Sequence, residues 1–171
     1  MSDGEAVVQG AVARDAGFDA FYGAEHVRLF HALFLLTWSR EEAEDVTHEA
    51  FVRVLERWER IREMASPRAY LYRTAVNLHR NRLRRRWRWT RLVFSDRGVE
   101  RDASEAAIAR ADVLRALGAV SREQREVLVL VDFLDLSAGE VAAVLGIDPD
   151  AVRARVHRGR ARMREELSDY G

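Results

Sequence analysis

The amino-acid sequence predicts an all-α protein made of two small helical domains joined by a linker, with a helix-turn-helix in the C-terminal domain. Apolar residues recur at helical spacing through most of the chain, and neither a strand-like alternation nor an Asn-Gly hairpin signal interrupts them. Serines followed three residues later by Glu or Gln precede several apolar runs, a pattern that marks helix starts. The stretch Trp87–Ala103 loses this periodicity and divides the helices into two groups.

The N-terminal domain is assigned to residues 14–88 and is expected to hold three helices. These helices are predicted over Phe18–Thr37, Ser39–Trp58 and Ser66–Arg86. The residues expected to face inward are Phe18, Phe21, Leu29, Phe30, Leu33 and Phe34 in the first helix and Ala43, Val46, Ala50, Val54, Leu55 and Trp58 in the second. The connection Glu59–Ala65 is predicted as a loop.

The C-terminal domain is assigned to residues 106–171, after a linker over residues 89–105. A short helix is expected from about Ala103 to Leu117, and a helix capped by Ser121 and Gln124 carries the apolar run Val127–Leu134. Because both domains are small and the linker is irregular, we expect them to be loosely coupled in the free protein.

The end of the chain has the signals of a helix-turn-helix. Ser137 and Glu140 form a predicted capping box, and Gly146 suits the left-handed residue that ends a helix. Asp148 then caps a second helix, with Pro149 at its first position. Two helices joined by a short glycine turn are typical of proteins that place the second helix in the DNA major groove.

The residues of this second helix divide by angle into distinct groups. The apolar group, expected to pack on the first helix, is Val152, Val156, Met163 and Leu167. The opposite face holds Asp150, Ala154, His157, Arg158 and Ala161. The flanks carry Arg153, Arg160 and Arg164 on one side and Arg155 and Arg162 on the other.

This arrangement predicts a DNA-reading helix. The small side chain of Ala154 lets the backbone approach the groove, so that His157 and Arg158 can reach base edges. The flanking arginines are placed to bind phosphates on either side of the groove. The alternative is a solvated amphipathic helix, but a merely solvated face usually mixes charge signs, whereas here arginines dominate from residue 153 to 164.

The third predicted helix carries a polar stripe of its own, made of Arg73, Asn77, Arg80 and Arg84 and bordered by Tyr70 and Asn81. Arginines, amides and an aromatic ring hold phosphates, read base edges and stack on unpaired bases. The alternative is a half-buried helix with an edge of snorkelling arginines.

Composition limits the functions that remain. The chain has no cysteine, which excludes structural disulfides, thiolate metal sites and a cysteine nucleophile. The N-terminus lacks a signal-peptide pattern, and the longest nearly uncharged stretch, Leu29–Ser39, is too short to cross a bilayer. A cytoplasmic protein without cofactor, metal or membrane insertion is therefore expected.

The net charge is zero, but it is unevenly distributed. Residues 67–95 contain 9 arginines and no acid, and residues 151–171 contain 6 arginines and 3 acids. Acidic stretches precede each of these basic segments. Two basic segments predict two contacts with a polyanion.

Three segments together resemble a bacterial sigma-70-family factor of the extracytoplasmic-function (ECF) group. They are EEAEDVTHEAFVRVLERW, SPRAYLYRTAVNLHRNRLRRR and SREQREVLVLVDFLDLSAGEVAAVLGIDPDAVRARVHRGRARMREEL. They are similar to the family's polymerase-clamp, −10-reading and −35-reading segments, in that order. Four positions depart from the usual pattern: His48 for Gln, Tyr70 for Trp, Asn81 for Asp, and Asp135 for Gly.

The resemblance implies a role for each segment. Core RNA polymerase would bind the exposed face of the second helix, namely Glu41, Asp45, His48, Glu49 and Val52. The −10 element would be read by Tyr70, Arg73, Asn77, Arg80, Asn81 and Arg84, and the loop Glu59–Ala65 would capture a flipped base. The −35 element would be read by Arg153, Ala154, Arg155, His157, Arg158, Arg160 and Arg162. An anti-sigma factor is a further possible partner, and the linker acids Asp96, Glu100, Asp102 and Glu105 would enter the polymerase channel or simply be solvated.

Two other classes of function compete with this interpretation. An enzyme is disfavoured because the histidines form no H-E-x-x-H spacing and no glycine-rich phosphate loop or G-x-S-x-G occurs. His48 and Glu49 are adjacent on one helix and so do not face one site. A promoter-binding regulator that acts without polymerase would need a sensor or dimerisation domain in place of the N-terminal half.

Overall fold

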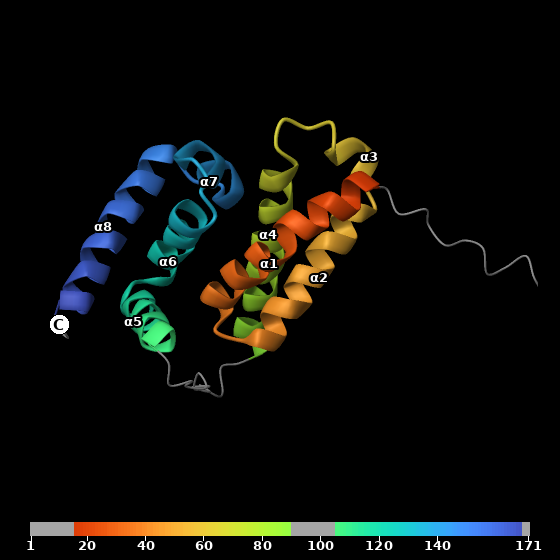
Figure 1. Cartoon of the computed structure of the whole chain (residues 1–171). Helices are drawn as coiled ribbons and strands as arrows, with labels where there is room; N and C mark the ends of the chain where they lie inside the picture. Colours follow the sequence, from red (N-terminus) through yellow and green to blue (C-terminus); the bar gives the residue numbers. More distant parts are fainter. Residues whose placement is uncertain (1–15, 90–104, 169–171) are drawn as a thin grey trace, which may run out of the picture.

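The computed structural model describes residues 16–89 and 105–168, and every regular element in these two ranges is helical (Figure 1). The N-terminal group comprises α1 (Ala16–Thr37), α2 (Arg40–Leu55), α3 (Trp58–Ile61) and α4 (Pro67–Trp89). The C-terminal group comprises α5 (Glu105–Ala119), α6 (Arg122–Leu128), the π-helical turn η1 (Val129–Phe133), α7 (Ala138–Leu145) and α8 (Pro149–Ser168). The predicted all-α class is confirmed. Most of the predicted linker lies outside the described residues.

The N-terminal domain is a bundle in which α1, α2 and α4 pack on one another around aromatic side chains. The rings of Phe18 and Trp58 meet edge to face at 5.4 Å, and Tyr22 packs on Phe51 at 4.7 Å. Phe51 is buried and was missed by the sequence prediction, whereas Leu55, predicted to face inward, is 43% exposed. The predicted loop after α2 contains part of the short helix α3. This helix buries Ile61 at the C-terminal end of α2.

The C-terminal domain follows the predicted caps closely. Reciprocal capping boxes form at Ser121–Gln124 and at Ser137–Glu140. Gly146 adopts φ +68°, the left-handed conformation that ends α7, and the Asp148 carboxylate accepts a hydrogen bond from the amide of Asp150 at 2.7 Å. These local signals fix where α7 ends and α8 begins, so they set the direction of the second helix of the motif.

The predicted helix through Leu134 is divided in the structure. Helix α6 ends at Leu128, and the π turn follows, with the amide of Leu134 donating to the carbonyl of Val129 at 3.0 Å. Asp135 then takes φ +53°, in the left-handed region that glycine occupies most easily. Glycine, which the resemblance leads one to expect at this position, would adopt this conformation with less strain than Asp135.

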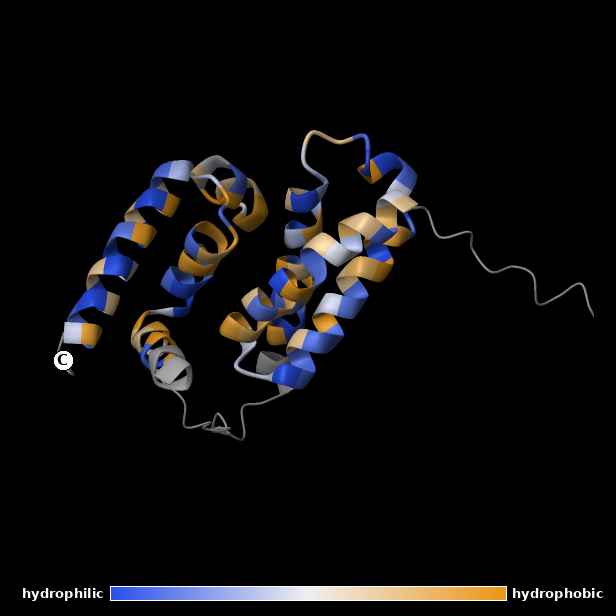
Figure 2. Ribbon diagram, viewed as in Figure 1, coloured by the Kyte–Doolittle hydropathy of each residue, from blue (hydrophilic) through white to orange (hydrophobic). Residues whose placement is uncertain are grey.

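Helix α8 lies across α5, α6 and α7 and buries Val152, Val156 and Gly159. Leu167, predicted to lie on this packed face, is 41% exposed, and Gly159 takes part in the packing instead. A Cβ atom built on Gly159 would lie 2.9 Å from the Cδ1 of Leu128, so α8 approaches α6 closely at this point. Figure 2 shows α8 hydrophilic along much of its length, with apolar residues on one side.

The two domains pack directly against each other, contrary to the loose coupling expected from the sequence. Helix α4 lies against α7, and α1 lies against η1, so that buried residues of both domains form one continuous core. The guanidinium of Arg125 in α6 stacks on the ring of Trp38 at 4.9 Å. Trp38 has φ +56°, an unusual conformation for a bulky residue, and this contact with the second domain helps to hold it there.

Replacing Gly159 by leucine is expected to destabilise the protein by about 1–3 kcal/mol, because the added side chain would push α8 away from α6. The same change at Gly118 provides the control. No atom of the surrounding protein lies within 4 Å of the position that a Cβ would occupy at Gly118, so leucine there should be neutral or slightly stabilising. Urea denaturation measures the free energy of unfolding of both variants. Equal values for the Gly159 and Gly118 variants would show that the contact between α8 and α6 has room for a larger side chain.

Candidate nucleic-acid interface

The outer side of α8 presents the residues predicted to read DNA. His157 and Arg158 are exposed, whereas Ala154 and Ala161 are partly buried. The face predicted to lie opposite the packed side is thus accessible at His157 and Arg158, but Ala154, predicted to be exposed, is partly covered. Both candidate base-reading side chains project from the third turn of the helix, away from the packed face formed by Val152 and Val156.

Several flanking arginines are held by acidic neighbours. The Nε of Arg160 lies 3.1 Å from a carboxylate oxygen of Asp132 in η1, and this hydrogen bond and charge raise the pKa of the guanidinium. Arg153 pairs with Asp150 one turn earlier, and Arg162 pairs with Glu165 at 3.2 Å. These contacts are exposed and hence weak, and they orient the side chains without preventing exchange for a phosphate.

A hollow of about 440 Å³ lies along one flank of α8. Its apolar floor is formed by Val131, Ala138, Val152 and Val156 and its basic rim by Arg153, His157, Arg160 and Arg164. The hollow places positive charge on the side of the helix where the sequence predicted phosphate contacts.

The polar stripe on α4 is largely exposed. Arg73, Asn77, Asn81 and Arg84 are exposed, and Tyr70 is partly buried. Arg84 donates a hydrogen bond to the amide oxygen of Asn81. The structure thus brings five of the six candidate −10 residues to one accessible side of the helix.

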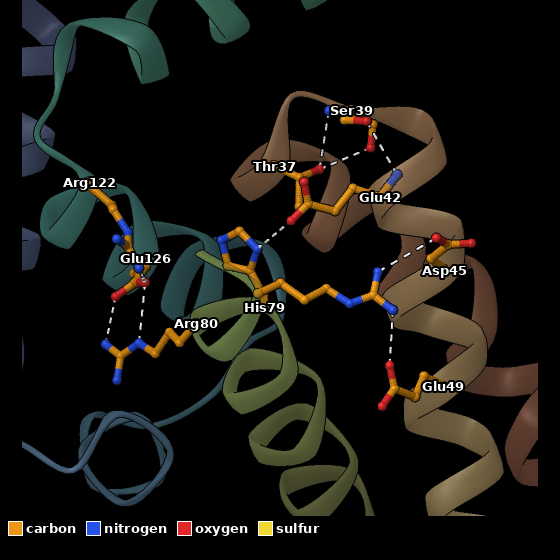
Figure 3. Close-up of polar contacts among 10 residues, drawn as sticks. Thr37, Ser39, Glu42, Asp45, Glu49, His79, Arg80, Arg122 and Glu126 are labelled. Carbon is orange, nitrogen blue, oxygen red and sulfur yellow. Dashed lines mark hydrogen bonds and ion pairs between the residues drawn. The ribbon is translucent and has the colours of Figure 1, made fainter. Parts of the chain in front are cut away.

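Arg80, the sixth residue, is turned toward the C-terminal domain (Figure 3). Its Nη2 lies 2.7 Å from a carboxylate oxygen of Glu126 in α6, and its Nη1 donates to the carbonyl of Leu145 at 3.0 Å. The side chain of Arg80 is 25% exposed and that of Glu126 is 4% exposed. In this arrangement the guanidinium of Arg80 is engaged inside the protein.

The candidate polymerase-binding face of α2 is exposed at Glu41, Asp45, His48 and Val52, and Glu49 is partly buried. Two of its acids are paired with Arg82 of α4, which lies 2.9 Å from Glu49 and 3.7 Å from Asp45. Burial alone would raise the pKa of Glu49, but hydrogen bonds and charge from Arg82 and Arg53 outweigh it and lower the pKa.

The side chains that connect different helices are not identifiable from the sequence pattern. Arg82, Glu126 and Arg68 were assigned no role, because their partners come from other helices and helical spacing reveals only neighbours on one helix. The sequence gives little sign of the burial of Glu126, because it follows the polar residues Arg122–Arg125 and directly precedes the buried Val127 and Leu128.

The geometry defines a helical protein with two basic surfaces on separate domains, one of them a helix-turn-helix. None of the helices in the described part of the chain has the length and apolarity needed to cross a bilayer. Residues 21–88 match the family Sigma-70 region 2, and residues 110–163 match Sigma-70, region 4. The chain belongs to the sigma-70 family of RNA polymerase sigma factors, in the ECF group, and is thus a transcription initiation factor.

Curated relatives agree with this assignment. The ECF RNA polymerase sigma factor SigE of Mycolicibacterium smegmatis is 30% identical over 84% of this chain, which spans 58% of that relative's length. The RNA polymerase sigma-E factor of Streptomyces coelicolor is 32% identical, covering 74% of this chain and 72% of the relative.

Two solved structures share the fold. The sigma factor RpoE of Bartonella quintana, solved with the anti-sigma factor NepR, superposes on 91% of this chain and 99% of its own, with a TM-score of 0.80 and 22% identity. CnrH, solved with the cytosolic domain of CnrY, covers 90% of this chain and 89% of its own, with a TM-score of 0.63 and 26% identity.

The ion pairs of Glu49 predict a loss of stability in acid. Because its folded-state pKa lies below the ordinary value of 4.5, Glu49 stabilises the fold above that value and loses this contribution as the pH falls through the folded pKa. Replacing Arg82 by glutamine should raise the pKa of Glu49 and weaken this acid dependence. NMR titration of the carboxyl in both proteins is the measurement, and an unchanged pKa would contradict the assigned pairing.

Proposed function

We propose that this chain directs core RNA polymerase to promoters by reading the −10 element with α4 and the −35 element with α8. The observation that carries the proposal is the pair of basic helical surfaces on two domains of the sigma-70 family. The domain limits proposed from the sequence are residues 14–88 and 106–171, with the linker between them.

The surface proposed to bind core polymerase is the outer face of α2, formed by Glu41, Asp45, His48, Glu49 and Val52. Acidic helix faces are often simply solvated, but this one also exposes Val52 at 40%, and an apolar group among charges favours a protein contact. The pairing of Asp45 and Glu49 with Arg82 fixes these two carboxylates relative to α4. Polymerase binding and −10 recognition would then take place on adjoining helices.

For the −10 element, we propose that Arg73 and Arg84 bind backbone phosphates, while Tyr70, Asn77 and Asn81 contact unpaired bases. All four side chains are exposed and so can reach DNA, and the division between them follows from the charge of arginine and the paired donor and acceptor of the asparagine amide. Tyr70 packs with one side against the core and keeps the other side open, which suits a ring that stacks on a base. Capture of a flipped base by residues 59–65, which include part of α3, also remains a proposal.

The direct test is run-off transcription from genomic fragments with core polymerase, with and without the chain. Promoter-specific transcripts are expected only in its presence. A protein that binds promoters but does not bind core polymerase in gel filtration would instead belong to the class of simple regulators, and the proposal would fail.

An anti-sigma protein is a further proposed partner. The support is the similarity to CnrH, which was solved with the cytosolic domain of CnrY. Such a partner is expected to prevent the chain from binding core polymerase. Candidates are tested by adding each one to the chain before polymerase; a candidate that leaves the complex intact is excluded.

The −35 helix allows a test that separates base reading from phosphate binding. Arg158→Ala should cost about 1–3 kcal/mol on the preferred promoter and relax discrimination at one or two bases. Arg162→Ala should weaken binding to all sequences alike and lower the salt slope by about one unit. Transcription from a library of −35 variants measures both effects, and an unchanged base preference for Arg158→Ala would show that the contact is misassigned.

Ala154→Leu examines the same surface by adding bulk. Because Ala154 lies opposite the buried face of α8, the fold should stay intact while entry into the groove is hindered. The partial burial of Ala154 makes thermal denaturation a necessary control. Full −35 recognition by a folded Ala154→Leu protein would place the groove contact on another side of α8.

A further inference from the structure

The ion pair between Arg160 of α8 and Asp132 of η1 differs from the other arginine pairs of the −35 helix. Arg153 and Arg162 pair with acids three residues away on the same helix. Asp132 comes from a different element, 28 residues earlier in the chain. One of the arginines proposed to bind DNA is therefore also the residue that connects α8 to η1.

The contact fixes the plane of the guanidinium. The Nε of Arg160 donates to Oδ2 of Asp132 at 3.1 Å, and its Nη2 donates to Oδ1. Each carboxylate oxygen thus accepts from a different nitrogen, which is the two-point geometry that orients an arginine most strictly. In the pair of Arg153 with Asp150, by contrast, both guanidinium nitrogens share one oxygen.

Both partners are attached to well-packed backbone. Asp132 lies in the π turn that also contains Val129 and Leu130, each 1% exposed. Arg160 directly follows Gly159, where α8 closely approaches α6. The packing of two separate elements therefore sets where the guanidinium lies.

The pairing leaves the outer edge of the guanidinium available. Arginine has five N–H donors in a fork, and Asp132 accepts one from Nε and one from Nη2. Among residues 16–89 and 105–168, no residue besides Asp132 accepts a hydrogen bond from the Arg160 side chain, which is 52% exposed. The edge formed by Nη1 and Nη2 can therefore donate to a phosphate while Asp132 stays in place.

The Arg160 side chain lies on the basic rim of the hollow along α8. Arg153, His157 and Arg164 share this rim. The flanks of a helix that enters the major groove face the sugar-phosphate backbone. A phosphate group beside the −35 bases is thus the ligand whose charge and geometry match this rim.

We propose that Asp132 is a positioning residue for −35 recognition, which holds the Arg160 guanidinium ready to bind a backbone phosphate of the DNA. The inference rests on the proposed role of α8 in reading the −35 element. Asp132 itself makes no contact with DNA. It acts by removing the need to order a long side chain when the complex forms.

Long-range electrostatics alone predicts the opposite effect for this residue. A carboxylate close to DNA repels the phosphates, so its removal should strengthen binding. If Asp132 orients Arg160, its removal should weaken binding instead. The sign of the change in affinity therefore distinguishes a positioning residue from a merely solvated acid.

Promoter binding is measured with holoenzyme reconstituted from core polymerase and the full chain, on a duplex promoter identified by run-off transcription. Asp132→Asn should bind at least about threefold more weakly, because Arg160 must then be ordered on binding. Glu165→Gln is the matched control, since it removes one charge from an exposed pair in which Arg162 contacts the acid through a single nitrogen. Its promoter binding should be unchanged or slightly tighter.

A second background separates positioning from a general role of Asp132 in folding. Arg160→Gln should weaken binding and lower the salt slope by about one unit, since one phosphate contact is lost. Adding Asp132→Asn to Arg160→Gln should cause no further loss, because the side chain to be positioned is gone. Thermal denaturation checks the fold, and Asp132→Ser replaces Asp132→Asn if that variant does not fold.

Two results would overturn the inference: unchanged or tighter promoter binding by Asp132→Asn, or an equal loss of binding in the presence and in the absence of Arg160. Run-off transcription by the unsubstituted chain separates the two proposals. Promoter-specific transcripts together with either result would reject the role of Asp132 and keep the sigma function. A chain that gives no such transcripts would reject both.

Discussion

The burial of one carboxylate, Glu126, constrains the arrangement of the whole molecule. A charge removed from water must be compensated nearby, and Arg122 of the same helix is too distant and too exposed to do so alone. Arg80 completes the compensation from the other domain, which fixes α4 against the turn between α7 and α8. In the same arrangement of the two domains, Arg28 and Arg68 reach carbonyl groups at the end of η1.

Local structure was largely predictable because it depends on neighbours in the sequence. The caps at Ser121, Ser137 and Asp148 and the left-handed Gly146 are formed as expected. Each of these features involves a side chain or backbone group within a few residues, and apolar spacing then identifies the buried face. The outward faces of α2, α4 and α8 could be derived in the same way.

The structure differs from the sequence prediction where a residue's conformation depends on contacts with a segment far away in the chain. The π turn at Val129–Phe133 leads into Asp135 at φ +53°, and its carbonyls are bound by arginines more than sixty residues away. Arg80 has the spacing of the α4 stripe, yet its guanidinium is drawn to Glu126. Helical periodicity places a residue on a face, but it contains no information about which other element covers that face.

The division of α8 into a packed side and an outer side has a consequence for how such a protein changes over time. The residues that hold the helix in place, Val152, Val156 and Gly159, are different from the residues that face outward, such as His157 and Arg158. Substitutions on the outer side therefore leave folding largely untouched. The residues proposed to read bases can therefore be replaced, in evolution or by design, without loss of the packing that holds α8 in place.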